Sequence, residues 1–192
     1  MYLVFLVLLI GSYLLGSIPF GYLVSKGKNV NIREIGSGNI GATNVYRALG
    51  MKWAVVVGLL DLAKGALPTL LAIFFLDSEV LILAVGIVAI AGHNWPVFLG
   101  FKGGRGVATT GGVVLVLMPL ITLIAVLIWI VLVKTTRYVS LGSVAVAVVY
   151  PVMAFFLEPR ANFIFILFLA AVIIFQHRPN IKRLLAGEEN KV

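Results

Sequence analysis

Long apolar stretches constrain the fold of this chain more than any other feature of its sequence. The hydrocarbon core of a bilayer is about 30 Å thick, so a helix that crosses it needs about 20 apolar residues. Stretches of about that length recur along the chain, at residues 2–24, 53–76, 80–99, 107–133, 139–157 and, somewhat shorter, 163–175. We therefore expect an all-α polytopic membrane protein that forms a single transmembrane domain over residues 1–192.

Composition excludes the soluble alternative. Hydrophobic residues make up 61% of the 192 residues and charged residues 11%, whereas soluble domains contain about 25% charged residues. The net charge of +8 fits cytoplasmic loops rich in Lys and Arg and anionic substrates, rather than nucleic acid. The chain has no cysteine, which excludes disulfides and thiolate metal sites. We predict no metal and no cofactor.

The stretch 107–133 decides the number of spans, because Pro119 lies near its middle. Basic residues gather in cytoplasmic loops, and those that directly follow the first stretch put the N-terminus outside. As one helix, 107–133 would leave six later basic residues on the outer face. With a turn at Met118, 13 of the 15 Lys and Arg lie inside, all except Lys64 in the membrane and Arg160 outside. We predict seven transmembrane helices, two of them short and between 107 and 133, with the N-terminus outside and the C-terminus cytoplasmic.

The first predicted cytoplasmic loop, residues 25–50, has the composition of a phosphate-binding segment. Its centre reads GSGNIGATN over 36–44. Glycines let the backbone turn N–H groups toward a ligand, and a forked guanidinium suits phosphate. The hydrophobic Ile40, Val45 and Tyr46 could dip back into the protein, which a flexible linker would not do. The candidate ligands are Lys26, Ser37, Gly38, Asn39, Thr43, Asn44 and Arg47.

The second cytoplasmic loop places glycines and two cations directly before a predicted helix. It consists of Lys102, Gly103, Gly104, Arg105 and Gly106. The first turn of a helix offers unpaired N–H groups and a partial positive charge, so it favours anions. The spacing does not match the nucleotide-binding P-loop. We expect this loop to bind phosphate.

A third polar segment follows the last span and contains His177, Arg178 and Asn180. A simple anchor at the membrane edge needs only Lys and Arg, whereas a histidine and an asparagine can also orient and polarise a substrate. By itself the segment fits either an interfacial anchor or a substrate-binding element.

Five further residues are candidates for supporting the site: Asp61, Lys64, His93, Ser143 and Arg178. Asp61 and Lys64 are three residues apart in the second span and so share a helix face. They form either a functional pair or a structural ion pair inside the bundle. His93 fits a ligand contact or a hydrogen bond at the helix end. For Ser143, and for Ser140 before it, we expect hydrogen bonds back to their own helix.

In the seven-span arrangement all three polar segments fall on the cytoplasmic side. They would then form one strongly cationic site with neutral donors, directly above apolar helices. Such a site predicts a ligand that is phosphorylated and lipidic.

Six motifs in order give the chain a specific resemblance. It resembles the bacterial membrane acyl-phosphate:glycerol-3-phosphate acyltransferases, the PlsY family, over nearly its whole length. The motifs are GSIPFGY at 16–22, GSGNIGATNVYR at 36–47, LDLAKG at 60–65, GHNWP at 92–96, FKGGRGVAT at 101–109 and HRPNIKRL at 177–184. Arg105 stands where the family pattern has Lys, which keeps the charge and changes the donor geometry.

The resemblance implies acyl transfer from acyl phosphate to the sn-1 hydroxyl of glycerol 3-phosphate, giving lysophosphatidic acid and phosphate. This is the first acylation step of bacterial phospholipid biosynthesis, in the cytoplasmic (inner) membrane. It also implies catalytic roles for Ser37, Arg47, His177 and Asn180, glycerol-phosphate binding by 102–106, and a structural role for Glu189. A soluble enzyme that makes acyl phosphate is the implied protein partner.

Two features of the mechanism stay open at this point. The base that accepts the hydroxyl proton is either His177 or a phosphate oxygen of a substrate. Ser37 is expected to bind phosphate rather than to attack, because no Ser–His–Asp arrangement is evident. Direct acyl transfer is therefore expected.

Other functions fit the sequence less well. The serious alternative is a membrane transporter of phosphate or organophosphate anions, which would need charges along a path through the bilayer. The His-x4-Asp motif of other glycerolipid acyltransferases is absent, since Phe98 and Lys182 occupy the Asp positions after the two histidines. A CDP-alcohol phosphotransferase would need several acidic metal ligands on one span, where Asp61 stands alone.

Overall fold

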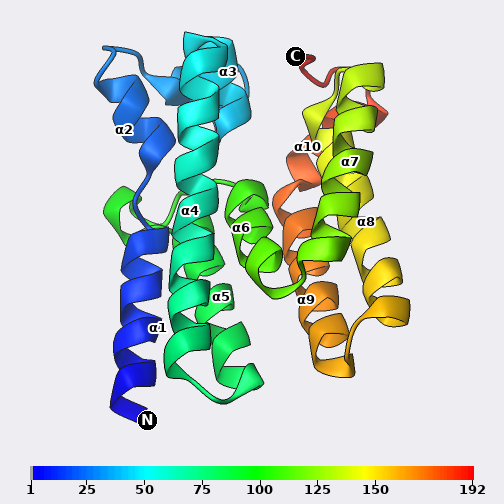
Figure 1. The fold of residues 1–192 in the computed structure, drawn as a ribbon. Helices are drawn as coiled ribbons and strands as arrows, with labels where there is room; N and C mark the ends of the chain where they lie inside the picture. The colour runs from blue at the N-terminus through cyan, green and yellow to red at the C-terminus, as the bar shows by residue number, and fades with distance from the viewer. Residues whose placement is uncertain (1) are drawn as a thin grey trace. The chain divides into compact units, whose positions relative to one another are not determined.

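The computed structural model describes residues 2–192, which form helices joined by short loops, with no β-strand among them. The expected all-α class is confirmed. The chain divides into two compact units, the first ending at Leu117 and the second beginning at Met118. Figure 1 shows the helices of both units. The assignment of the whole chain to one functional domain stays a prediction.

Unit 1 is built around the long helix α4, which contacts α1, α5 and α6 along its length. The short helices α2 and α3 pack against one end of α4 and against each other (Figure 1). Its elements are α1 (Tyr2–Gly16), α2 (Phe20–Lys26), the 3-10 helix η1 (Ile32–Glu34), α3 (Ala42–Leu49), α4 (Met51–Phe75), α5 (Glu79–Asn94), the 3-10 helix η2 (Val97–Leu99) and α6 (Val107–Leu117).

Unit 2 consists of three long helices packed in chain order and a short terminal helix. Helix α8 packs against both α7 and α9, and α10 contacts α8 and α9 (Figure 1). Its elements are α7 (Pro119–Thr136), α8 (Val139–Leu157), α9 (Arg160–Gln176) and α10 (Arg178–Leu185).

Prolines interrupt two of the predicted spans. The stretch 2–24 is broken between α1 and α2 at Pro19, which lacks an N–H and disfavours helical geometry at the residue before it. The stretch 80–99 is helical only to Asn94, because Pro96 follows and the chain continues as η2. Both stretches still qualify as candidate spans by length and apolarity, but neither is a continuous helix.

The loop predicted over residues 25–50 contains ordered structure that the sequence reasoning did not anticipate. Both η1 and α3 lie inside it. Ile32, Ile40 and Val45 are buried with Val57 of α4 in one apolar cluster. This burial stabilises a helix as short as α3, which would be marginal in isolation. The expectation that Ile40 and Val45 dip into the protein is confirmed.

Glycines set the close helix contacts of unit 1. A Cβ at Gly65 of α4 would lie 2.1 Å from the carbonyl oxygen of Thr109 on α6, and one at Gly112 of α6 would lie 2.0 Å from that of Leu62. Gly16 of α1 meets α5 in the same way. Small residues allow this approach of backbones in membrane bundles. The contacts fix α6, and hence the loop before it, against the middle of α4.

Helix length and apolarity identify several candidate membrane spans. Among residues 2–192, five qualify: residues 2–26, 51–75, 79–99, 119–136 and 139–157. Helices α9 and α10 form a sixth if this pair, bent by 59°, is one span, and α6 is a shorter apolar helix. The predicted break at Met118 is confirmed, since α6 ends at Leu117 and α7 begins at Pro119. The count of seven spans and the orientation stay predictions.

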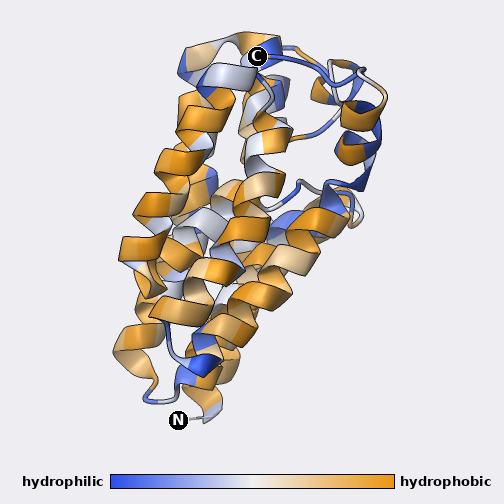
Figure 2. Ribbon diagram, turned by 90° about the vertical axis from the view of Figure 1, so that its right-hand side faces the viewer, coloured by the Kyte–Doolittle hydropathy of each residue, from blue (hydrophilic) through white to orange (hydrophobic). Residues whose placement is uncertain are grey.

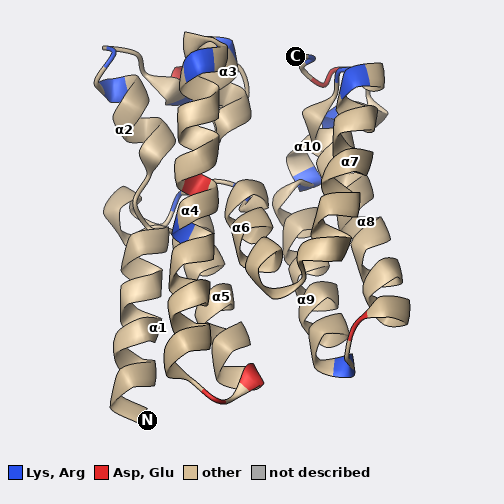
Figure 3. Ribbon diagram, viewed as in Figure 1, with Lys and Arg blue, Asp and Glu red and all other residues tan. Residues whose placement is uncertain are grey.

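Charge and hydropathy are segregated along each unit. Hydrophobic residues cover the long helices and hydrophilic residues concentrate in the loops (Figure 2). In unit 1 most basic residues lie at the end formed by α2 and α3, whereas acidic residues mark the α4–α5 turn (Figure 3). In unit 2 basic residues gather around α10 and the adjoining ends of α7 and α8. Each unit thus has one basic end, as the positive-inside rule requires.

Candidate active site

The first polar loop is organised by the buried side chain of Asn44, which is 1% exposed. Its Nδ2 donates to the carbonyl oxygens of Ile32, Ile35 and Asn39 at 3.1, 2.9 and 2.9 Å. Its Oδ1 accepts the backbone N–H of Ser37 at 3.1 Å. We expected this amide to face substrate; instead it is engaged within the loop, and it fixes the backbone at Ser37.

Glycine 36 brings two candidate residues together. A Cβ there would lie 2.6 Å from Asn44 Oδ1 and 3.2 Å from Cδ of Arg47, and the residue has a positive φ of 54°. Arg47 therefore packs beside Gly36, which directly precedes Ser37. Arg47 and Ser37 are both half-buried. Gly38 also has a positive φ, and its N–H donates to the carbonyl of Ile35 at 2.9 Å. That N–H is part of a turn, contrary to the expectation that it faces an anion.

Arg33 connects the first polar loop to the second. Its Nη2 donates to the carbonyl oxygen of Lys102, 69 residues later in the chain. The side chain of Lys102 is exposed and that of Arg105 is half-buried. Lys26, at the end of α2, is also exposed, and its Nζ lies 6.0 Å from the ring centroid of Tyr22. Unit 1 therefore brings the first two predicted segments together, as expected.

The glycines of the second loop have a different use from the one predicted. The N–H of Gly103 donates to the carbonyl of Asn94 at 3.2 Å, and that of Gly104 to the carbonyl of His93 at 3.0 Å. These two groups were expected to bind an anion and are instead engaged with the end of α5. The donors that suit an anion here are the cationic side chains of the loop and the first turn of α6, which begins at Val107.

Asp61 and Lys64 form an ion pair inside unit 1, as their spacing predicted. Lys64 Nζ lies 2.8 Å from Asp61 Oδ1 and donates to the carbonyl of Ile18 at 2.9 Å. His93 joins them, with Nδ1 3.6 Å from Asp61 Oδ1. All three residues are at most 4% exposed. The ion pair faces the bundle interior, and His93 completes a cluster of three buried residues.

In unit 2 a buried carboxylate gathers the polar residues of the third segment. Glu189 accepts hydrogen bonds from Asn180 Nδ2 at 2.7 Å, from Ser140 Oγ at 2.9 Å and from Arg183 Nε at 2.7 Å. Burial raises the pKa of Glu189, but these hydrogen bonds and the Arg183 charge outweigh burial and hold that pKa below 4.5. The carboxylate therefore fixes α10 and the start of α8 to the C-terminal segment.

His177 has a defined tautomer. Its Nδ1 lies 2.8 Å from the carbonyl oxygen of Ile173. A carbonyl only accepts, so Nδ1 carries the proton and Nε2 of the neutral ring is an acceptor. The residue is 2% exposed, and it sits between α9 and α10. This is the tautomer a general base would need.

Arg178 of the third segment and two serines of α8 have structural contacts. Arg178 Nη1 donates to the carbonyl of Phe175 at 3.1 Å, and its guanidinium stacks over that ring. Ser143 Oγ donates to the carbonyl of Val139 at 2.9 Å, the expected bond back to its helix. For Ser140 that expectation is wrong, because its hydroxyl donates to Glu189.

Comparison with known proteins gives a consistent result. The family described as glycerol-3-phosphate acyltransferase matches residues 6–187. The glycerol-3-phosphate acyltransferase of Thermoanaerobacter sp. (strain X514) is 47% identical over 94% of this chain and 92% of its own length. That of Aquifex aeolicus (strain VF5) is 46% identical over 97% of this chain and 98% of its own.

The chain belongs to the glycerol-3-phosphate acyltransferase family. Two crystal structures of PlsY (YgiH), an integral membrane glycerol 3-phosphate acyltransferase, resemble it closely. The glycerol 3-phosphate form has a TM-score of 0.93 at 43% identity, over 98% of this chain and 95% of that one. The lysophosphatidic acid form has a TM-score of 0.90 at 42% identity, over 97% and 94%.

Membership of this glycerol-3-phosphate acyltransferase family agrees with the enzyme class and the membrane location that the motifs implied. Sequence reasoning missed Arg33, counted only as a basic loop residue. No local pattern could have revealed its bond to the carbonyl of Lys102, since the two positions are 69 residues apart. The engagement of Asn44 within its own loop was also missed, because a substrate ligand and a loop-fixing amide look alike in sequence.

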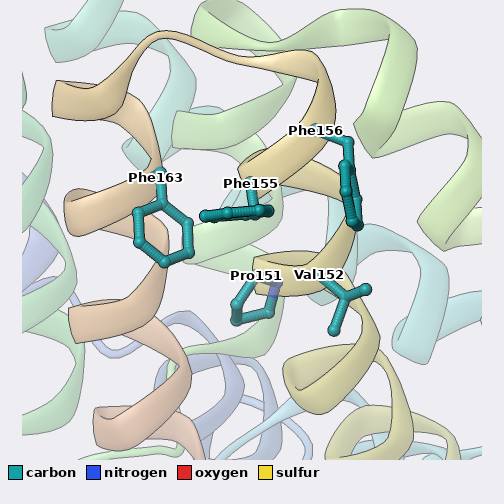
Figure 4. Close-up of a pocket in the computed structure, with 5 residues that line it drawn as sticks. All are labelled: Pro151, Val152, Phe155, Phe156 and Phe163. Carbon is teal, nitrogen blue, oxygen red and sulfur yellow. The ribbon is translucent and has the colours of Figure 1, made fainter.

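One apolar pocket of about 260 Å³ lies in unit 2, away from the candidate residues. Figure 4 shows its lining side chains, which belong to α8 and α9. Phe163 lies near the start of α9, and His177 directly follows the end of this helix. The 14 positions between them correspond to roughly 21 Å at 1.5 Å per residue. An apolar lining at this end of α9 is suited to lipid tails and holds none of the predicted polar groups. The lining residues are Pro151, Val152, Phe155, Phe156 and Phe163.

Proposed function

We propose that this chain transfers a fatty acyl group from acyl phosphate to the sn-1 hydroxyl of glycerol 3-phosphate. The products are lysophosphatidic acid and inorganic phosphate, and the step begins phospholipid synthesis at the cytoplasmic face of the bacterial inner membrane. The observation that carries the proposal is the joining of two cationic loops in unit 1 through Arg33 and the carbonyl of Lys102. Two phosphorylated substrates need such a concentration of positive charge.

The cations of unit 1 have distinct proposed roles. Lys102 and Arg105 bind the phosphate of glycerol 3-phosphate, with Lys26 adding long-range attraction. Arg47, which packs beside Gly36, stabilises the phosphate of the acyl donor as it leaves. Charged and hydrogen-bonding groups placed where charge develops lower the barrier more than groups that bind the ground state equally.

The neutral residues of the first loop complete this site. Ser37 contributes its hydroxyl to phosphate binding, together with the half-buried side chains of Asn39 and Thr43. Asn44 shapes the loop by its four hydrogen bonds rather than by touching substrate.

The third segment supplies the base in this proposal. The hydroxyl oxygen of glycerol 3-phosphate attacks the acyl carbon, the bond from that carbon to the phosphate oxygen breaks, and the hydroxyl proton passes to His177 Nε2. Asn180, fixed through Nδ2 by Glu189, orients the hydroxyl with its Oδ1. That His177 and Asn180 serve the same site as the loops of unit 1 rests on the charge distribution along the chain and on the family motifs.

The role of His177 has a direct test. His177→Ala should lower kcat by about 10²–10⁴-fold at saturating substrates if its imidazole is the base. Near-normal kcat would transfer the role to a phosphate oxygen of a substrate. The transfer is direct, so an acyl group trapped on Ser37 would contradict the proposed chemistry.

The experiment that tests the function uses the purified protein in detergent, with no vesicle. Acyl phosphate, acyl-CoA and acyl carrier protein are compared as donors to glycerol 3-phosphate. We expect lysophosphatidic acid and an equal amount of phosphate with acyl phosphate only. Turnover with acyl-CoA alone would refute the donor assignment. Absence of turnover with every donor, together with anion uptake after reconstitution, would favour a transporter.

In the cell the donor must come from a soluble enzyme that makes acyl phosphate. Acyl phosphate is a reactive mixed anhydride with a lipid tail, so its release near the basic cytoplasmic loops would shorten its exposure to water. We propose that enzyme as the functional partner of this chain.

A further inference from the structure

A cluster of buried polar residues in unit 1 is not used by the proposed reaction. Asp61 and Lys64 of α4 and His93 of α5 are each at most 4% exposed. The carboxylate lies between the other two, 2.8 Å from Lys64 Nζ and 3.6 Å from His93 Nδ1. Charges buried in a membrane bundle are costly, so a role beyond packing is expected for this cluster.

Both arms of the cluster reach a break in the backbone. Lys64 Nζ donates to the carbonyl of Ile18, at the interruption between α1 and α2. His93 lies at the other side, next to the end of α5, where the chain leaves the helix toward the second polar loop. The cluster thus ties α4 to the segments that border this loop.

The imidazole of His93 is the surface on which Gly104 rests. A Cβ at Gly104 would lie 2.1 Å from Nε2, 2.8 Å from Cε1 and 3.0 Å from Cδ2 of that ring. The N–H of Gly104 donates to the carbonyl of the same histidine at 3.0 Å. Gly104 is therefore held by both the ring and the backbone of one residue, and only a glycine fits there without displacement.

The next residue of α5 supports the loop in the same manner. The carbonyl of Asn94 accepts the N–H of Gly103 at 3.2 Å, and its Oδ1 lies 2.6 Å from where a Cβ of Gly106 would be. The loop that carries Lys102 and Arg105 is thus built on the last two residues of α5. Because its glycine N–H groups are used in this way, the position of the two cations depends on this support.

We infer that His93 is a positioning residue for glycerol 3-phosphate binding: its ring, which lies beside Asp61, sets the place of Lys102 and Arg105 through Gly104. This rests on the proposed function, in which those two cations bind the phosphate of the acceptor. His93 does not touch substrate. Lys64 balances the carboxylate and connects the cluster to the α1–α2 break.

The inference predicts a selective loss. A loop that moves by about 1 Å can cost up to about 10²-fold in an oriented site. His93→Ala removes the supporting ring, so the KM for glycerol 3-phosphate should rise by about 10–100-fold. The KM for acyl phosphate should rise much less, because Asn44 fixes the first loop and the displaced second loop reaches it through the Arg33 bond to Lys102.

Gly104→Ala provides a second route to the same displacement without changing any buried charge. Its methyl group would overlap the His93 ring, so the loop must move away and the KM for glycerol 3-phosphate should rise. In the double variant the new methyl group occupies space that the ring has left. The fold rise in its KM should therefore be well below the product of the two single fold rises. His93→Gln should keep part of the affinity for glycerol 3-phosphate that His93→Ala loses.

The experiment uses the purified full-length protein in detergent. It measures kcat and both KM values, the binding of glycerol 3-phosphate alone at equilibrium, and the unfolding temperature. Gly111→Ala is the matched control, since Gly111 is on α6 and nothing lies within 4 Å of a Cβ there. It should leave both KM values unchanged.

Two results would overturn the inference. One is an equal rise of both KM values in His93→Ala, which indicates general damage to the bundle. The other is a double variant whose effect equals the product of the single effects, which shows that the ring and Gly104 act independently. Failure of the wild-type protein to acylate glycerol 3-phosphate would instead refute the proposed function.

Discussion

The Glu189 carboxylate offers the sharpest test of how unit 2 is held together. It is 8% exposed and accepts three hydrogen bonds, from Ser140 of α8, from Asn180 of α10 and from Arg183 of α10. Glu189→Ala removes the acceptor of all three and leaves Ser140 and Asn180 as buried donors. Glu189→Gln keeps the shape but turns an N–H₂ group or a neutral oxygen toward Arg183.

The magnitude follows from these contacts. A hydrogen bond to a charged group contributes about 1.5–3 kcal/mol, and breaking a buried pair by removing one partner costs about 3–5 kcal/mol. We expect Glu189→Ala to lower the free energy of unfolding by about 3–5 kcal/mol and Glu189→Gln by about 2–3 kcal/mol. At roughly 2–4 °C per kcal/mol for a chain of this size, the alanine variant should unfold at least about 6 °C lower.

The assay is thermal unfolding of the purified protein in detergent, followed by turnover at a temperature where each variant is folded. Glu188→Gln is the matched control, because it removes the same charge from the exposed neighbouring residue. The control should unfold like the wild type. Turnover of Glu189→Ala should also fall, since Asn180 loses its support. Equal unfolding temperatures for Glu189→Ala and Glu188→Gln would refute the reasoning.

Three further predictions follow from named contacts. Because its pKa is held below 4.5, Glu189 stabilises the fold at neutral pH, and this contribution is lost as pH falls through the lowered pKa. The difference in unfolding temperature between wild type and Glu189→Gln should therefore shrink in acid. A difference that stays constant with pH would contradict this prediction. Gly112→Ala should lower the free energy of unfolding by about 1–3 kcal/mol, because its methyl group would meet the carbonyl of Leu62, while Gly111→Ala should not; equal unfolding temperatures would be the contrary result. Asn44→Ala should lower kcat at a temperature where the variant is still folded, since it releases the backbone at Ser37. An unchanged kcat at that temperature would remove its assigned role.

Local features of the fold were predictable from the sequence. The apolar stretches and the break at Met118 depend on residue type and on proline within a few positions, and α8 begins and ends where its apolar stretch does. The prolines at 19 and 96 also act locally, and their effect on the first and third spans could have been taken into account. Helix α3 was missed because it is stabilised by contacts with Ile32 and Val57 rather than by its own sequence.

The site was predictable as a set of residues but not in its contacts. The spacing of Asp61 and Lys64 indicated their pairing, whereas His93 reaches them from another helix. The glycines at 103 and 104 were expected to present N–H groups to an anion. Instead, these glycines pack closely against the end of α5. The sequence does not distinguish anion binding from close packing, since a glycine allows both by its missing side chain.

The central claim is that the basic segments of both units face the same side of the membrane. Because the chain has no cysteine, single cysteines report their own side. Lys28→Cys and Lys182→Cys replace exposed residues outside the proposed site, and Pro119→Cys replaces an exposed residue at the predicted outer turn. An impermeant thiol reagent applied to intact cells should label only Pro119→Cys, and the other two only after permeabilisation. Labelling of Lys28→Cys, of Lys182→Cys or of both from outside would contradict the account.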